Sequence, residues 1–273
     1  MRAAQSRVNR KLDLRGVRAE LAAATVPTAE GGKPKSVGYP DFMSSPGFLT
    51  DGNRIYAIGD IHGQVEKLRA LHAAVAEDLS RRPIASARLV YLGDYIDWGP
   101  DSAAVLSLLA QPPATMPATF LVGDHEQMLL EALDGDGAAA TDWLYSGGRA
   151  TLASWGIDPE APRDRWAAGM PPAHLAFMRG LKLRHRAGGY LFVHAGIRPR
   201  VKSADQTRQD LLGIREPFLS TERNLGRVVV HGHTVSGTPV IRFNRIGLDT
   251  GAGLGGPLTA AVLESDLVAF LAA

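Results

Sequence analysis

The 273-residue sequence contains no cysteine, which excludes disulfide bonds, thiolate metal sites and a cysteine nucleophile. It has no run of about 18 apolar residues, so no membrane-spanning helix and no membrane partner are expected. No apolar stretch follows the first basic residues, so a secretory signal is not expected either. These absences favour a cytoplasmic protein that works in a reducing compartment.

The sequence also has little net charge, because 30 Lys and Arg oppose 28 Asp and Glu. Basic residues look concentrated only near the N-terminus, and no basic cluster is interleaved with aromatic residues. We therefore expect no patch that binds nucleic acid. Hydrophobic residues make up 45% of the chain, enough for one large core or for a core with a smaller cap.

The regular part of the sequence begins near Arg54. Residues 1–50 lack steady periodicity and include a loop rich in Pro, Gly and Lys, so they are predicted to form a loosely structured N-terminal arm. Residues 51–273 are predicted to form a single domain. Its first part alternates short apolar runs with segments of helical spacing, the pattern of βαβ units with a largely parallel sheet.

A segment at about 135–182 interrupts this alternation. It contains Gly, Pro and three of the four tryptophans, and it is predicted to be a mostly helical, cap-like insertion near the site. Four strand-like runs follow it: "GYLFVHAG", "RVVVHGHT", "RIGLDTG" and "PLTAAVLES". Their close spacing suggests a second sheet. The predicted fold class is therefore α/β (α+β), with a two-layered β core and helices outside.

Six potential metal ligands follow the predicted strands. Three early strands end in Gly-Asp and two later ones end in "HAG" and "HGHT"; the six side chains are Asp60, His62, Asp94, Asp124, His194 and His233. In α/β folds, ligands gather at the carboxyl ends of strands. A single Gly-Asp is usually a turn or a helix cap, but five such features in order are improbable by coincidence. Three carboxylates in one dry crevice repel one another, and two divalent cations would relieve this repulsion.

Five short motifs carry a resemblance to a known family. "GDIHG" (59–63), "GDYIDWG" (93–99), "GDHE" (123–126), "HAG" (194–196) and "GHT" (232–234) resemble the ordered signature of the phosphoprotein-phosphatase family of calcineurin-like metallophosphoesterases. Bacterial serine/threonine phosphatases and diadenosine tetraphosphatases belong to that family. The resemblance implies a calcineurin-like β sandwich of two mixed sheets flanked by helices. It also implies a metal-dependent phosphoric ester hydrolase, a phosphatase or phosphodiesterase.

The resemblance assigns a role to each matching residue. Asp60 and His62 would bind one divalent ion, Asp94 would bridge both ions, and Asp124, His194 and His233 would complete the second site. Mn is the first choice of metal, and Fe or Zn also suits such mixed oxygen and nitrogen ligands. His125 would be the general acid, Asp97 would orient it, and Arg215 would bind the phosphate. A metal-bridging hydroxide would then attack the phosphorus atom in line.

The sequence departs from the family pattern at several positions. Trp98 stands where the family has a phosphate-clamping arginine, Asp124 where it has asparagine, and Gly213 where it has tryptophan. Relative to the family, the site loses the positive charge of an arginine and gains the negative charge of a carboxylate. This change should weaken the binding of dianionic monoesters and favour diesters or bulky, less charged substrates. Trp98 would stack on an apolar or aromatic substrate group, or it would simply fill the space left at Gly213. Asp124 would either hold its metal ion more tightly, or it would be an engineered substitution or one that lowers catalytic activity.

Three functions remain open from the sequence. The first is a dinuclear-metal phosphoesterase with a phosphoester substrate that is a small molecule, a nucleotide or a phosphoprotein. The second is a diadenosine-tetraphosphatase-like nucleotide hydrolase, in which Trp98 and the tryptophan-rich insertion would stack on adenine. The third is a metal-binding pseudophosphatase that binds phosphorylated partners without turnover. The oligomeric state is not indicated.

Overall fold

The larger sheet has six strands and provides the first half of the site. The structure is a computed structural model that describes residues 41–112, 116–135 and 137–273. The strand order is β1-β11-β10-β2-β3-β4. The parallel strands are β2 (Asn53–Ile58), β3 (Ser86–Tyr91) and β4 (Ala118–Phe120), and the antiparallel ones are β1 (Met43–Ser44), β10 (Thr259–Glu264) and β11 (Leu267–Ala272).

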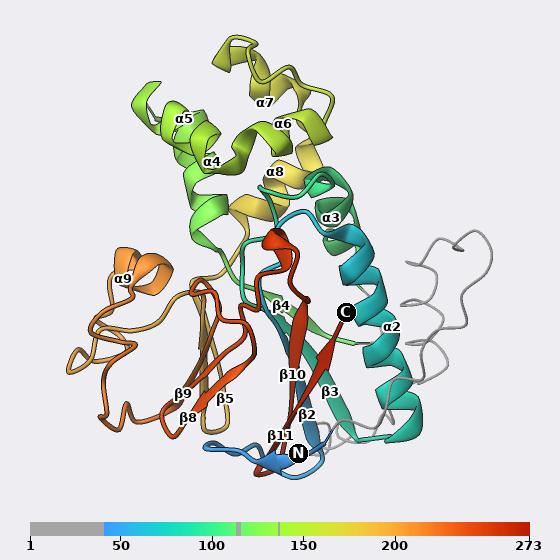
Figure 1. Cartoon of the computed structure of the whole chain (residues 1–273), viewed down its shortest axis with the longest axis vertical. Coiled ribbons are helices and arrows are strands. Elements are labelled where there is room, and N and C mark those ends of the chain that lie inside the picture. Colours follow the sequence, from blue (N-terminus) through green and yellow to red (C-terminus); the bar gives the residue numbers. More distant parts are fainter. Residues whose placement is uncertain (1–40, 113–115, 136) are drawn as a thin grey trace, which may run out of the picture.

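Two helices pack on the outer face of this sheet. Helix α2 (Val65–Arg81) runs along the sheet in Figure 1, and α3 (Ser102–Leu109) follows β3. The buried residues of α2 include Leu68, Leu71 and Val75, which recur at helical spacing. They join the apolar side chains of one sheet face in a single core cluster. This is the βαβ arrangement that the alternating sequence pattern predicts.

The smaller sheet has five strands, in the order β5-β6-β7-β9-β8. These are β5 (Arg184–Ala187), β6 (Tyr190–Val193), β7 (Val228–His231), β8 (Val240–Arg242) and β9 (Arg245–Gly247). Side chains of both sheets, among them Val90 and Phe192, share a second core cluster, so the sheets form a sandwich. The short helix α9 (Arg208–Gly213) packs against the second sheet through a third cluster.

The segment between the sheets is mostly helical and stands at one end of the sandwich in Figure 1. It follows α4 (Asp124–Asp134) and comprises α5 (Gly137–Trp143), the π-helical turn η1 (Leu144–Gly148), α6 (Arg149–Ser154), the 3-10 turn η2 (Arg163–Arg165), α7 (Trp166–Gly169) and α8 (Pro172–Arg179). A last 3-10 turn, η3 (Ala252–Leu254), follows β9. Within the described residues, no helix is long and apolar enough to cross a bilayer.

Two sequence expectations need correction. The run "PLTAAVLES" contains β10, which lies in the six-stranded sheet, antiparallel to β2, rather than in the second sheet. Strand β1 also pairs with β11, and Leu49 is buried, so residues 41–50 belong to the sandwich rather than to the arm. Residues 1–40 lie outside the described part. Both errors have one cause: a strand's partner depends on contacts between distant segments that periodicity does not encode.

Candidate metal centre

The structure brings all six predicted metal ligands to one end of the sandwich. Asp60 and His62 follow β2, Asp94 follows β3, Asp124 begins α4, and His194 and His233 follow β6 and β7. The first four come from the six-stranded sheet and its connections, and the two last histidines come from the five-stranded sheet. The site therefore exists only because the two sheets face each other.

Four of these residues form a close set of potential ligands. One carboxylate oxygen of Asp124 lies 2.7 Å from His194 Nε2 and 3.0 Å from His233 Nδ1. Asp94 Oδ1 lies 3.5 Å from the same His194 nitrogen. The ligand atoms of Asp94, Asp124, His194 and His233 all lie within 4.8 Å of one another. Burial alone would raise the pKa of Asp124, but the two imidazoles hold it below its ordinary value.

The second set shares Asp94 with the first. Its other oxygen, Oδ2, lies 3.5 Å from His62 Nε2. The Nδ1 of His62 contacts the carbonyl of Ile96 at 2.9 Å, and Nδ1 of His194 contacts the carbonyl of Leu92 at 2.9 Å. A ring that donates from Nδ1 leaves the Nε2 lone pair free to bind a metal. Each oxygen of Asp94 therefore faces one imidazole, as a bridging ligand would.

Asp60 shows independently that the site is built for cations. Its Oδ2 accepts a hydrogen bond from the backbone N–H of His233 at 2.8 Å, while its Oδ1 is buried without a hydrogen-bond partner. Burial raises the pKa of Asp60 well above its ordinary value, and nearby Asp249 and Asp94 raise it further. A buried carboxylate with an unpaired oxygen among other carboxylates is stable as an anion only beside a positive charge. The residues present therefore fit two divalent cations.

The backbone of the site is strained. In the part of the chain that the structure describes, seven residues other than glycine have a positive φ, and five of them are His62, Asp94, Asp97, Trp98 and His233. Left-handed backbone costs such residues about 1–3 kcal/mol each, and it persists only where the surroundings enforce it. Strain of this kind is concentrated at functional sites.

Glu126, which the sequence argument left without a role, enforces the turn after β3. This fully buried carboxylate accepts backbone hydrogen bonds from Asp94 at 2.9 Å, Tyr95 at 2.7 Å and Gly123 at 2.9 Å. Burial raises its pKa to about 7, with Asp94 adding to the effect. Glu126 thus fixes Asp94 relative to the start of α4. The signal was present in the "GDHE" motif, but only the folded chain shows which N–H groups it binds.

His125 and Asp97 form the predicted pair. The Nδ1 of His125 lies 2.8 Å from Asp97 Oδ2, and Asp97 is fully buried. Burial alone would lower the pKa of His125, but Asp94, Asp97 and Asp124 raise it to about 10. His125 therefore carries a proton at neutral pH in the metal-free protein.

The insertion completes this pair. Trp143 Nε1 donates to Asp97 Oδ2 at 2.9 Å, and the hydroxyl of Thr151 donates to Asp97 Oδ1 at 2.5 Å. Neither residue was identified from the sequence, because a tryptophan and a threonine in an insertion carry no motif. The insertion therefore helps to orient His125 and does not merely stand near the site.

Trp98 lies beside His125 and is half-exposed. Its ring centroid is 6.2 Å from that of His125, and it packs beside Gly147, where an added Cβ would lie 3.2 Å from the indole. An added Cβ at Gly213 would meet nothing within 4 Å. That Trp98 fills the space left at Gly213 stays an alternative to its predicted contact with the substrate.

Two further expectations concern the tryptophans of the insertion and Arg215. Trp143 and Trp166 are buried, and Trp155 is partly buried with its Nε1 bonded to His174, so among the insertion's tryptophans only Trp155 has ring surface left for the predicted stacking on adenine. Arg215 is exposed just after α9. Its side chain forms no hydrogen bond or ion pair with any residue in the described ranges, so its contact with phosphate stays a prediction.

Asp249 was missed altogether. It follows β9 and is buried, and its Oδ1 accepts a hydrogen bond from the N–H of Gly251 at 3.0 Å. Burial raises its pKa, and Asp249 in turn raises the pKa of Asp60. A fourth carboxylate at the site increases the need for bound cations. The sequence "LDTG" after an apolar run resembled the other strand ends and could have indicated it.

Comparison with known proteins identifies the class to which this fold and site belong. Residues 53–249 match the family model described as calcineurin-like phosphoesterase, and the chain belongs to this family. The match spans all the predicted metal ligands. The predicted family and fold class are thereby confirmed.

The curated relatives include serine/threonine-protein phosphatases and a nucleotide hydrolase. Over 96 residues the chain is 44% identical to serine/threonine-protein phosphatase 2 of Escherichia coli (strain K12), a match that covers 34% of this chain and 38% of the relative. Serine/threonine-protein phosphatase 1 of Salmonella typhimurium is 29% identical, over 77% of this chain and 92% of the relative. The symmetrical bis(5'-nucleosyl)-tetraphosphatase of Methylococcus capsulatus is 32% identical, over 53% of this chain and 44% of the relative. The chain thus spans less than half the length of two of these three proteins.

Solved structures support the fold. A structure described as a putative diadenosine tetraphosphatase superposes with a TM-score of 0.58 at 23% identity, covering 80% of this chain and 93% of that one. At this level of identity the similarity concerns the fold alone.

Proposed function

We propose that the protein hydrolyses phosphate esters with the help of two divalent cations. The observation that carries this proposal is that Asp94 belongs to two sets of potential ligands, one with Asp124, His194 and His233 and the other with His62 and His125. Asp60, His62 and Asp94 would hold one cation; Asp94, Asp124, His194 and His233 would hold the other. The cations supply Lewis acidity and lower the pKa of bound water. Mn is the first choice of metal, with Fe or Zn as alternatives.

The residues of the chain supply the remaining steps. His125 donates the proton of Nε2 to the leaving oxygen, because its Nδ1 is held by Asp97. Asp97 keeps its orientation through Trp143 and Thr151 and stabilises the positive charge on the ring. Arg215 contacts a phosphoryl oxygen of the substrate and offsets its negative charge.

Substrate preference follows from Trp98 and from the charge of the site. The half-exposed indole of Trp98 beside His125 offers a flat apolar face to the leaving group. The acidic Asp124 and Asp249 at the metals disfavour a dianionic monoester. We therefore favour diesters or bulky, less charged phosphoesters over phosphoproteins. A nucleotide hydrolase resembling the tetraphosphatase relatives is the second candidate, because Trp98 could stack on a base.

A pseudophosphatase is the remaining alternative, and one experiment separates it from the enzyme. The protein loaded with Mn²⁺ is assayed against phosphopeptides, dinucleoside polyphosphates, monoesters and diesters, and its metal content is measured. We expect two ions per chain and turnover of at least one class. Two bound ions without turnover would establish the pseudophosphatase, and the absence of bound metal would contradict the proposed site.

The remaining sequence predictions concern the whole chain. A single domain with an N-terminal arm, a cytoplasmic location and the absence of a nucleic-acid or membrane partner stay predictions. Fractionation of cells and limited proteolysis of the purified chain would test the location and the arm.

A further inference from the structure

One loop crosses from the smaller sheet to the larger one beside the metal centre. It lies between β9 and β10 and comprises residues 249–257, which we call the crossing loop; η3 forms its tip (Figure 1). Asp249 at its start is buried, whereas Leu254 is exposed. Among the residues of this loop, all of which the structure describes, only Ala252 joins an apolar core cluster. The tip therefore depends on polar contacts to keep its position.

Lys67 of α2 provides two of these contacts. Its Nζ donates to the carbonyl oxygen of Ala252 at 2.8 Å and to that of Gly256 at 2.7 Å. Lys67 stands in the first turn of α2, where a positive charge opposes the helix dipole. This placement does not favour the helix itself, and the two hydrogen bonds to the crossing loop give it a different purpose.

The surrounding charge makes these contacts of Lys67 unusual. Residues 41–181 and 248–273, which we call the six-stranded half, contain 10 Lys and Arg and 21 Asp and Glu. Residues 182–247, the five-stranded half, contain 12 Lys and Arg and only 4 Asp and Glu. A lysine of the acidic half would ordinarily pair with a carboxylate. Within the described residues, however, Lys67 forms no ion pair, and its hydrogen bonds go to the crossing loop.

The tip of the crossing loop packs directly on the predicted metal ligand His62. An added Cβ at Gly253 would lie 2.8 Å from Cβ of His62 and 3.1 Å from its Cγ, which is too close for a side chain unless His62 moves. Gly253 follows Ala252, whose carbonyl Lys67 binds. The ring of His62 also contacts that of His125, with centroids 4.8 Å apart. The position of the tip therefore limits where the imidazole of His62 can lie.

A second route leads from Lys67 to the same set of ligands. Gly256, the other residue that Lys67 binds, donates its N–H to the carbonyl of Gly251 at 2.9 Å. Gly251 in turn donates its N–H to Asp249 Oδ1 at 3.0 Å. Both ends of the crossing loop thus depend on the contacts with Lys67.

We infer that Lys67 is a positioning residue for the cation of Asp60, His62 and Asp94. It holds the crossing loop against His62 and so fixes the ring whose Nε2 faces Asp94 at 3.5 Å. This inference rests on the proposed two-cation function and extends it to a residue outside every motif of the sequence. The cation of Asp124, His194 and His233 should not depend on Lys67.

Binding of Mn²⁺ to Lys67→Met tests this, because position and charge act in opposite directions. Removing a positive charge near bound cations would by itself strengthen their binding. Loss of the loop contacts should instead raise the Kd of one of the two ions about tenfold, as loss of contacts behind a metal ligand does. Calorimetry at pH 7 measures both Kd values. Two Mn²⁺ ions that share Asp94 are magnetically coupled, so partial loading of the variant should give an uncoupled EPR signal.

Gly253→Ala is an independent variant, since it leaves Lys67 in place and puts a methyl group against His62. It should weaken the same ion. Arg81→Met is the matched control, because it removes one positive charge from the last turn of the same helix, where Arg81 pairs with Glu77. Both ions should bind to it as to the wild type.

A loss confined to one ion in Lys67→Met and in Gly253→Ala would support the inference. An unchanged or lower Kd in either variant, an equal loss of both ions, or the same loss in Arg81→Met would overturn it. A wild-type protein that binds fewer than two ions would contradict the proposed function instead.

Discussion

The two halves of the molecule contribute different chemistry to one site. The six-stranded half supplies the carboxylates Asp60, Asp94 and Asp124 and the His125–Asp97 pair, and it is acidic. The five-stranded half supplies the imidazoles of His194 and His233 and the exposed Arg215, and it is basic. Cation binding is thus concentrated in one half, while the other half offers nitrogen ligands and exposed arginines to an anionic substrate.

This difference has a physical basis. Carboxylates clustered without cations repel one another, so the acidic half depends on metals for its local stability. Neutral imidazoles bind metals without adding charge, and they leave the basic half free to attract phosphate. A phosphoesterase needs both properties within a few ångströms, and the sandwich provides them from opposite sheets.

The largest expected effect comes from removing a ligand from each half. Asp94→Ala should abolish the binding of both ions and lower kcat by roughly 10³-fold or more, because Asp94 faces both ligand sets. His194→Ala should remove one ion and retain the other. Metal content per chain and turnover measure both. Asp142→Asn, an exposed acid of the six-stranded half, is the control and should behave as wild type.

Removing the proton donor tests whether the six-stranded half alone provides the acid. His125→Gln should lower kcat roughly 10²-fold for a substrate with an alcohol leaving group, with both ions still bound. The loss should be smaller for p-nitrophenyl phosphate, whose leaving group needs less protonation. A loss of the same size for both substrates would contradict the role of His125 as general acid.

A third prediction concerns the interior, where each half buries one histidine outside the predicted metal ligands. Burial lowers the pKa of His72 in the six-stranded half to about 4, and it does the same for His231 in the five-stranded half. A histidine whose folded pKa lies below its unfolded value of about 6.5 favours unfolding as the pH falls below 6.5. Between pH 6.5 and 5, His72 should therefore lower the free energy of unfolding by about 2 kcal/mol.

Urea unfolding of the metal-free protein at pH 7 and pH 5 measures this loss. His72→Gln should reduce the difference between the two pH values by that amount. Tyr91→Phe removes the hydroxyl that contacts His72 at 2.8 Å but keeps the histidine, so the pH dependence should remain. An unchanged difference in His72→Gln would refute the assignment.

The smallest expected effect concerns Trp98. Trp98→Arg should shift the ratio of kcat/KM for bis-p-nitrophenyl phosphate over p-nitrophenyl phosphate about tenfold toward the monoester, since an arginine binds the extra charge. Tyr145→Arg introduces the same charge at another exposed aromatic residue of the insertion and should leave the ratio nearly unchanged. If the wild type already strongly prefers the monoester and Trp98→Arg does not improve it, the proposed role of Trp98 is wrong.

Much of the fold could be predicted from local pattern. The strands that became β2, β3 and β4, and the helices α2, α3 and α4, have strong periodicity and clear ends. The weak points were β1, β5 and β8, which are short strands at sheet edges, β11, which was not singled out, and β10, which was placed in the wrong sheet. Edge strands carry little signal because half of their hydrogen-bonding groups and side chains face no partner.

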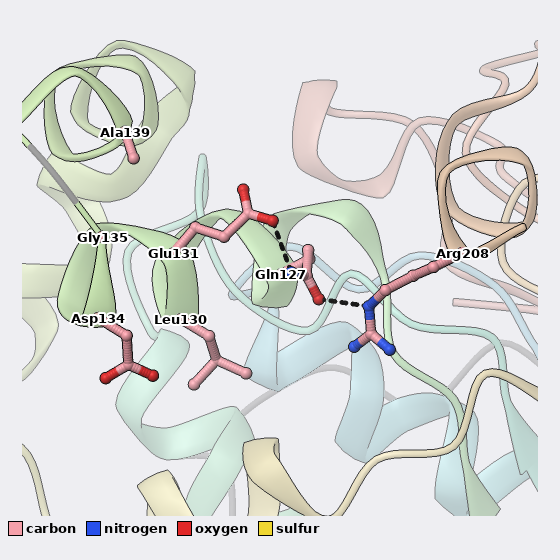
Figure 2. A pocket seen from close by; sticks show the side chains of 7 residues that line it. All are labelled: Gln127, Leu130, Glu131, Asp134, Gly135, Ala139 and Arg208. Atoms are coloured by element: carbon pink, nitrogen blue, oxygen red, sulfur yellow. Dashed lines mark hydrogen bonds between the residues drawn. The ribbon is translucent and has the colours of Figure 1, made fainter.

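The residues of the site also divide into those that local pattern predicts and those that only contacts between distant segments reveal. Six ligand candidates and the His125–Asp97 pair stand directly after strands, so their proximity followed from the rule that strand ends meet. Glu126 and Thr151 could not be assigned in this way, because their roles depend on which atoms of other segments they reach, whereas Asp249 stands just after β9 and was overlooked. The hydrogen bond between Arg208 of α9 and Gln127 of α4 (Figure 2) also depends on the packing of distant segments, which no motif records.

The sequence by itself determined the family, the chemistry of the ligands and the positions where they leave their strands. It did so because these features are local: a motif, a residue type and an alternation of strand and helix. Only the tertiary structure decided that Asp94 faces two imidazoles, that the insertion orients Asp97, and that an arginine of the basic half lies on the helix of the acidic half. Those relations arise from packing between segments far apart in the chain, and burial at their meeting point sets the charges of the groups that they bring together.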